Sequence, residues 1–316
     1  MTDINEFSAV LTDVDPERAR RRPAIDWPTF IVGTNVYAAF LIVTWNFHAL
    51  PWWLVMPLGG FIVCLHGSLQ HEAVHGQPFR RRILNSAFVF PSLWLWLPYT
   101  QYRRTHLIHH RNERLTSPVD DPESNYVTAE QWTRMGAAHR LLRRAMTTSA
   151  GRLLLTPPYV AATVWFELFR KIRRRDLDYL RHWLIQIPAA GLVLAWVMGV
   201  CGIPFWQYLL LFAYPGVSLT VLRSYLEHQA RVPVDERTAI VEAGPVMSLL
   251  YLNNNLHALH HLEPATPWHQ RRRRFNQRRD EIYAGNGHYS FSGYGEIVWR
   301  YLFRPKEPVV HPIPGI

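Results

Sequence analysis

The chain has 316 residues; 48% are hydrophobic, 13% aromatic and 18% charged, and the formal net charge is +10. This apolar composition excludes a disordered chain. Two cysteines exclude a disulfide scaffold, a cysteine-rich zinc module and a cysteine-ligated iron–sulfur protein. A net positive charge is typical of proteins that bind nucleic acid or an anionic membrane surface, and the positions of the charges along the chain distinguish the two.

Lysine and arginine are absent from two long windows, between Pro23 and Phe79 and between His182 and Leu222. Each window holds two apolar runs of about 18–22 residues, long enough to cross a hydrocarbon core of about 30 Å as a helix. We therefore predict four spans in two helical hairpins. Their approximate bounds are 29–50, 52–70, 183–203 and 204–222.

All basic residues lie on one side of these hairpins, so the positive-inside rule places both termini and the middle segment in the cytoplasm. We expect one all-α, multi-pass domain of the cytoplasmic membrane over 1–316, with a cytoplasmic, histidine-rich cap and no nucleic-acid partner. Residues 1–26 lack the apolar core of a signal peptide and are expected to be a cytoplasmic tail, and 305–316 an irregular one. Segment 83–99 is expected to form a re-entrant or interfacial pair of half-helices, and 153–169 a proline-broken interfacial helix.

Histidines concentrate in three boxes: HEAVH (His71, His75), HLIHH (His106, His109, His110) and HALHH (His257, His260, His261). On a helix, residues three and four apart share a face, so each box presents its imidazoles in one direction. Our topology puts all three boxes on the same side of the membrane. Eight imidazoles exceed the needs of one tetrahedral zinc and suffice for two five- or six-coordinate ions of iron, copper, nickel or zinc.

These boxes, in this order around two hairpins, resemble those of the membrane fatty acid desaturase and hydroxylase superfamily, which includes carotenoid ketolases. Four longer stretches between Cys64 and His269 also resemble bacterial members: LHGSLQHEAVHGQP, HHRNERLTSPVDDPES, RSYLEHQ and NNNLHALHHLEPATPWH. The resemblance implies a non-haem centre of two iron ions (Fe2+/Fe3+) and dioxygen as co-substrate. It also implies His228, in RSYLEHQ, as a ninth ligand, and a water-bridged asparagine, Asn253 or Asn254.

The resemblance further implies electrons from a separate protein, because no HPGG haem motif is present. This donor would be a ferredoxin, a rubredoxin or a cytochrome-type protein with its reductase. The first box has three residues between its histidines, where animal acyl-CoA desaturases have four, so their substrate class is not carried over. The predicted activity is a desaturase acting on a fatty acyl chain. The alternative is a hydroxylase or ketolase of a lipid, an isoprenoid or carotenoid, or a small metabolite.

Metal-bound imidazoles usually donate their second nitrogen to an acceptor. Six acidic residues are the candidates: Glu72, Asp120, Asp121, Glu123, Glu227 and Glu263. His66 points off the face that carries His71 and His75, so we expect it to be a buried, hydrogen-bonded residue. We interpret 271–274 as a lipid-facing basic patch, and Trp268 as a residue that could border the substrate entrance.

HEAVH also satisfies HExxH, the motif of zinc metalloproteases, with Glu72 as general base. That interpretation leaves both HxxHH boxes unexplained, and no later Asp-Gly element supplies a third ligand. A transporter or a metal-binding membrane protein would carry ionisable groups inside its spans, and these spans hold almost none. The oxygen-dependent oxidoreductase therefore remains the favoured hypothesis.

Overall fold

The computed structural model describes residues 23–111 and 113–313, so most of the predicted N-terminal tail, and only 314–316 of the predicted C-terminal tail, lie outside the described residues. Four helices are long and apolar enough to cross a membrane, which confirms the predicted spans. The first hairpin consists of α3 (Trp27–Trp45) and α4 (Trp52–Val74), joined through η1 (Phe47–Ala49). In the second, α11 (Leu177–Leu194) continues into η2 (Ala195–Val200), and the return helix comprises α12 (Phe205–Tyr208), η3 (Leu209–Ala213) and α13 (Tyr214–Glu227).

Three of the four helices extend several residues beyond one end of the apolar runs that predicted them, whereas α3 ends at Trp45, five residues before the predicted end at 50. α4 continues to Val74 and α13 to Glu227, several residues past the predicted ends, and α11 begins earlier, at Leu177. Hydropathy marks only the apolar part of each helix, whereas the helix continues through polar residues that other elements cover. The ends of α4 and α13 thereby reach the histidine-rich region.

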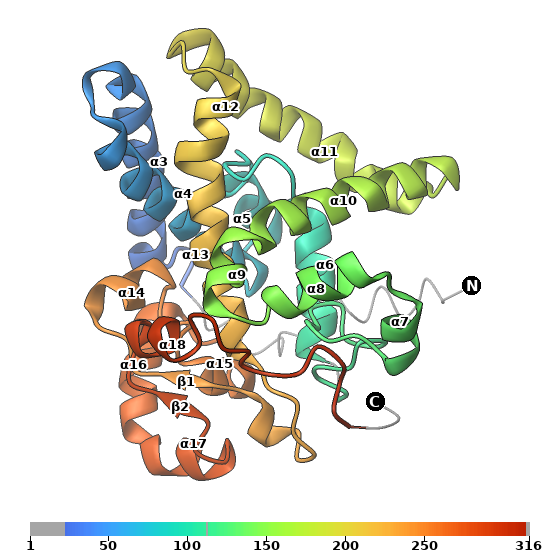
Figure 1. The fold of residues 1–316 in the computed structure, drawn as a ribbon. Helices are drawn as coiled ribbons and strands as arrows, with labels where there is room; N and C mark the ends of the chain where they lie inside the picture. Colours follow the sequence, from blue (N-terminus) through green and yellow to red (C-terminus); the bar gives the residue numbers. More distant parts are fainter. Residues whose placement is uncertain (1–22, 112, 314–316) are drawn as a thin grey trace.

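The remaining elements are α10, a long helix, several shorter helices, and one pair of two-residue strands, β1 and β2, which pair in parallel with Ile240 opposite Ser290. Figure 1 shows α14 to α18 and both strands grouped at one end of the long helices; we call this group the cap. The other elements are α5 (Arg82–Phe88), α6 (Tyr99–His110), α7 (Ala129–Arg134), α8 (Ala137–Ala145), α9 (Ser149–Leu154), α10 (Thr156–Arg173) and η4 (Asp235–Arg237). The cap comprises β1 (Ile240–Val241), α14 (Pro245–Leu250), α15 (His257–Leu262), α16 (Trp268–Gln277), α17 (Arg279–Gly285), β2 (Ser290–Phe291) and α18 (Tyr294–Arg300).

Segment 83–99 forms only one of the two expected half-helices. After α5, residues 89–98 are irregular until α6 begins. The spans hydrogen-bond this stretch: Tyr208 donates to the Leu93 carbonyl, Gln186 to the Leu95 carbonyl, and Ser92 N–H to the Ala189 carbonyl. Irregular backbone at membrane depth is tolerated when protein groups satisfy it in this way.

The expected break in segment 153–169 is present: α9 ends at Leu154, Leu155 forms a turn, and α10 begins at Thr156. The two prolines of α10 lie in the first turn, where a helix needs no amide donor and proline is favoured. The prolines therefore mark the break between α9 and α10, and they lie at the start of the second helix.

α4 and α13 cross closely because glycine stands at their contact. A Cβ atom added to Gly216 would lie 2.6 Å from Val63 Cβ, and one added to Gly60 would lie 2.9 Å from Pro215 Cβ. Small residues allow helix backbones to approach this closely inside membranes. The close crossing fixes the relative positions of the helix ends that carry His71, His75 and His228.

Candidate metal centre

Nine histidines gather into two groups in which the ring nitrogens lie within 4.8 Å of one another. The first group contains His71, His75, His106, His110 and His260, and the second contains His109, His228, His257 and His261. All nine are residues that the sequence singled out. They come from the ends of α4, α6 and α13 and from α15.

Each HxxHH box is divided between the two groups. In α6, His106 and His110 belong to the first group and His109 to the second; in α15, His257 and His261 belong to the second and His260 to the first. Residues four apart differ by about 40° around a helix, whereas a residue three along lies about 60° to the other side. The box spacing therefore directs two rings to one group and one ring to the other.

The Nε2 atoms converge in a way that hydrogen bonding cannot satisfy. His106 Nε2 lies 3.1 Å from both His75 Nε2 and His110 Nε2, and His110 Nε2 also lies 3.0 Å from His260 Nε2. In the second group, His257 Nε2 lies 3.0 Å from His228 Nε2 and 3.1 Å from His261 Nε2. A ring nitrogen carries either one hydrogen or one lone pair, so it cannot make two directed hydrogen bonds. Lone pairs converging on one point fit a bound cation.

The spacing of the closest nitrogen atoms can be compared with ideal coordination geometries. Ligands about 2.0–2.1 Å from an ion lie about 3.4 Å apart on a tetrahedron and about 2.9 Å apart at right angles. The observed separations of 3.0–3.1 Å are closer to the right-angled arrangement. The five closest nitrogen pairs are therefore nearer to the right-angled spacing than to the tetrahedral one.

Carboxylates hold the outer nitrogens of several of these rings. Asp121 Oδ1 lies 2.8 Å from His109 Nδ1, and Glu123 Oε1 lies 2.9 Å from His106 Nδ1. Glu227 Oε1 lies 3.3 Å from His257 Nδ1. An acceptor at Nδ1 fixes the ring so that the Nε2 lone pair faces the centre. These three acids were among the six candidates.

Asp120 and Glu263, two of the other candidates, lie away from the histidines. Asp120 pairs with Arg114, and Glu263 pairs with Arg274 and Arg278. Neither acid contacts a histidine of the two groups in the described part of the chain.

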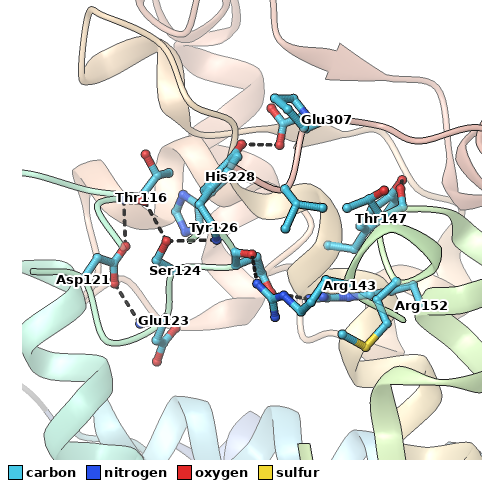
Figure 2. A pocket seen from close by; sticks show the side chains of 15 residues that line it. Thr116, Asp121, Glu123, Ser124, Tyr126, Arg143, Thr147, Arg152, His228 and Glu307 are labelled. Atoms are coloured by element: carbon cyan, nitrogen blue, oxygen red, sulfur yellow. Dashed lines mark hydrogen bonds between the residues drawn. The ribbon is translucent and has the colours of Figure 1, made fainter. Parts of the chain in front are cut away.

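The loop that carries Asp121 and Glu123 is itself fixed by hydrogen bonds. Asp121 accepts from the backbone N–H groups of Thr116 at 2.8 Å and Glu123 at 2.9 Å. The loop lines a cavity of about 50 Å³, together with His228 and Arg152. Figure 2 shows Asp121 and Glu123 on one side of the cavity and Arg152 on the opposite side. The loop therefore presents both carboxylates in set directions.

Burial keeps most of these rings neutral. It lowers the pKa of His110, His228 and His261 well below the usual value, as it does for His257 and His260. Burial alone would raise the pKa of Glu123, but the neighbouring His106 and His109 lower it to about 2. Neutral imidazole is the form that binds metals, so the site is prepared for an ion.

Of the two candidate asparagines, the structure brings Asn254 to the histidines. Its Nδ2 donates to Glu227 Oε1 at 3.0 Å and lies 3.5 Å from His71 Nε2. Its Oδ1 is buried and has no hydrogen-bond partner among the described residues. Asn253 instead donates to the Trp268 carbonyl.

Arg271 departs from the predicted lipid-facing patch. It is completely buried; its Nη2 lies 2.6 Å from Glu72 Oε1, and its Nη1 donates to the Leu252 carbonyl at 3.0 Å. Glu72 in turn accepts from the Trp268 backbone N–H and lies 3.5 Å from His71 Nδ1. The patch prediction was wrong at this position. The sequence feature that indicates burial at this position is Phe275, which lies four residues later on the same helix face and is also fully buried.

The same contacts weaken the metalloprotease alternative. A general base needs access to the metal-bound water, whereas Glu72 is 1% exposed and is held by Arg271. His66 lies outside both groups and contacts the Tyr37 hydroxyl at 3.2 Å, as expected for a buried, hydrogen-bonded histidine.

The comparisons agree with this geometry. The sequence model of the fatty acid desaturase family matches residues 47–293, a range that contains all nine histidines. No curated protein matches the chain. The family match covers most of the chain, and the four apolar helices and two groups of histidines agree with it. The chain is therefore an integral membrane protein and belongs to the fatty acid desaturase family.

Proposed function

We propose that this oxidoreductase uses two iron ions and dioxygen to attack an unactivated C–H bond, and that its reaction is the desaturation of a fatty acyl chain. One observation carries the proposal: nine imidazoles from four separate segments converge, as groups of five and four, in a chain of the desaturase family. Imidazole ligands suit iron, and the closest nitrogen pairs are nearer to the right-angled spacing than to the tetrahedral one.

The first ion would be held by His71, His75, His106, His110 and His260, and the second by His109, His228, His257 and His261. Asn254 would hold a water molecule on one of them through its unpartnered oxygen. When bound, a pair of iron ions supplies the redox chemistry that activates dioxygen.

The protein's own groups hold and orient the ligands. With Nδ1–H donated to Asp121 or Glu123, the rings of His109 and His106 present Nε2 as an acceptor, and Glu227 lies 3.3 Å from the outer nitrogen of His257. Nine neutral imidazoles leave the charge of two ions uncompensated, and these carboxylates offset part of it. Buried surroundings also exclude bulk water, which protects a reactive site from side reactions.

The partners follow from the family and from the membrane-spanning helices. We propose dioxygen, a lipid or lipid-like substrate and a separate electron-donor protein, with the histidine groups and both termini on the cytoplasmic side. Product analysis separates desaturation from hydroxylation or ketolation, because only the first leaves a double bond without added oxygen.

The first experiment measures metal per chain by mass spectrometry, in detergent-purified protein from iron-supplemented cells. We expect about two iron ions and little zinc. Alanine at His110 should abolish activity and lower the metal content, whereas alanine at the exposed His139 should change neither. One zinc ion without iron, or unchanged turnover of the His110 variant, would contradict the proposal.

A further inference from the structure

A cavity of about 160 Å³ reaches the first histidine group from outside. His75 and His110 line it, together with three arginines, Arg82, Arg103 and Arg111. Arg82 and Arg111 are exposed and Arg103 is half-buried, so the basic side chains extend from solvent toward the two histidines. The cavity is therefore a route to the candidate metal centre whose charged side chains are positive.

Two of the three arginines that line this cavity have no carboxylate partner in the described part of the chain. No aspartate or glutamate lines it among the described residues, and neither Arg82 nor Arg103 forms an ion pair with a described residue. Burial, and then the charges of Arg103 and Arg111, lower the pKa of Arg82. Guanidinium groups gathered in this way repel one another unless an anion lies between them.

The remaining walls suit a molecule with an apolar part. Val74, Leu107 and Pro264 complete much of the lining. The volume is many times the 10–15 Å³ or so that one water molecule requires. His110 also keeps Nδ1 buried without a hydrogen-bond partner among the described residues, so one polar group of this wall lacks an acceptor.

We propose that this cavity binds an oxyanion, the carboxylate or phosphate head group of the substrate, through Arg82, Arg103 and Arg111. This inference rests on the proposed function. It identifies the substrate of that function as an anion whose head group lies beside the first histidine group. Arginine is suited to this role because its planar fork matches both carboxylate and phosphate oxygens.

The test is isothermal titration of the full-length protein as purified, in uncharged detergent, with inorganic phosphate and with hexanoate. The double variant Arg82→Gln/Arg103→Gln should bind the preferred anion at least tenfold more weakly than the unmodified protein. Arg81→Gln/Arg104→Gln is the matched control; both residues are exposed and neither lines the cavity, so its affinity should not change. The variant Arg82→Lys/Arg103→Lys keeps the positive charge but lacks the planar guanidinium group, so it should bind the anion with intermediate affinity. This variant also provides the test if the glutamine variant fails to fold.

Tighter binding of hexanoate indicates a carboxylate head group, and tighter binding of phosphate indicates a phosphate ester. Equal affinity in the glutamine variant and the control would overturn the proposal, as would a folded protein that binds neither anion. A third outcome would also overturn the proposal: the glutamine variant keeps its anion affinity but loses the salt-dependent reduction by an acidic ferredoxin. The arginines would then bind the electron-donor protein and not the substrate.

Metal content measured in the same preparations separates the two proposals. Anion binding in a protein that takes up no iron would refute the proposed function and leave this site standing. Two iron ions without anion binding would refute this inference alone.

Discussion

The buried pair of Arg271 and Glu72 allows a quantitative test of how the cap supports the metal centre. Replacing Arg271 by leucine leaves Glu72, which is 1% exposed, with the Trp268 N–H at 3.2 Å but without its cation. Removing one partner of a buried ion pair typically costs about 3–5 kcal/mol. At about 2 °C per kcal/mol for a chain of this size, the thermal midpoint should fall by about 6–10 °C.

The assay is thermal unfolding in a mild detergent, combined with metal content, because Glu72 also lies against His71. Arg273→Leu, an exposed arginine of the same helix, is the matched control and should stay within about 0.5 kcal/mol of the unmodified protein. Arg271→Leu/Glu72→Gln should recover much of the loss, since the uncompensated charge is then gone. If the Arg271 variant were as stable as the Arg273 control, the pair would have no structural role and the reasoning would be refuted.

Three further predictions concern the same region. His257→Ala should reduce the metal to about one ion per chain by mass spectrometry, and two retained ions would refute its assignment as a ligand. Asp121→Asn should weaken metal affinity about 10–100-fold in a chelator competition, whereas Glu263→Gln should not; equal affinities would exclude an orienting role for the aspartate. Gly216→Ala should cost about 1–3 kcal/mol in thermal unfolding, because the added Cβ overlaps a neighbouring helix, while Gly191→Ala, with open space around it, should be tolerated. Similar stability of the two glycine variants would show that the close helix crossing is not required.

Hydropathy and spacing determined a large part of this protein. Two windows without lysine or arginine are enough to specify four spans, because a membrane selects on length and polarity, which are local properties of the chain. Helical periodicity likewise determines that His106 and His110 share a face, whatever the rest of the fold does. The family resemblance added His228, which no periodic pattern marks.

Other features depended on contacts between distant segments. Asn253 and Asn254 are equivalent in the sequence, and only the packing of 251–256 against α4 and α13 brings the second to Glu227 and His71. Segment 89–98 is apolar enough for a helix, but hydrogen bonds from the spans satisfy its irregular backbone.

Arg271 shows the same distinction most clearly. The sequence placed it in a run of four arginines, where a solvated or lipid-facing position is the ordinary expectation. The tertiary structure buries it because Glu72, almost 200 positions earlier in the chain, supplies the opposite charge. The sequence by itself determined the spans and the histidine boxes, since those depend on neighbours within a few turns of helix. Only the tertiary structure decided the division of the histidines into five and four and the carboxylates that hold them, because charge compensation and convergence depend on residues that meet only when the chain is folded.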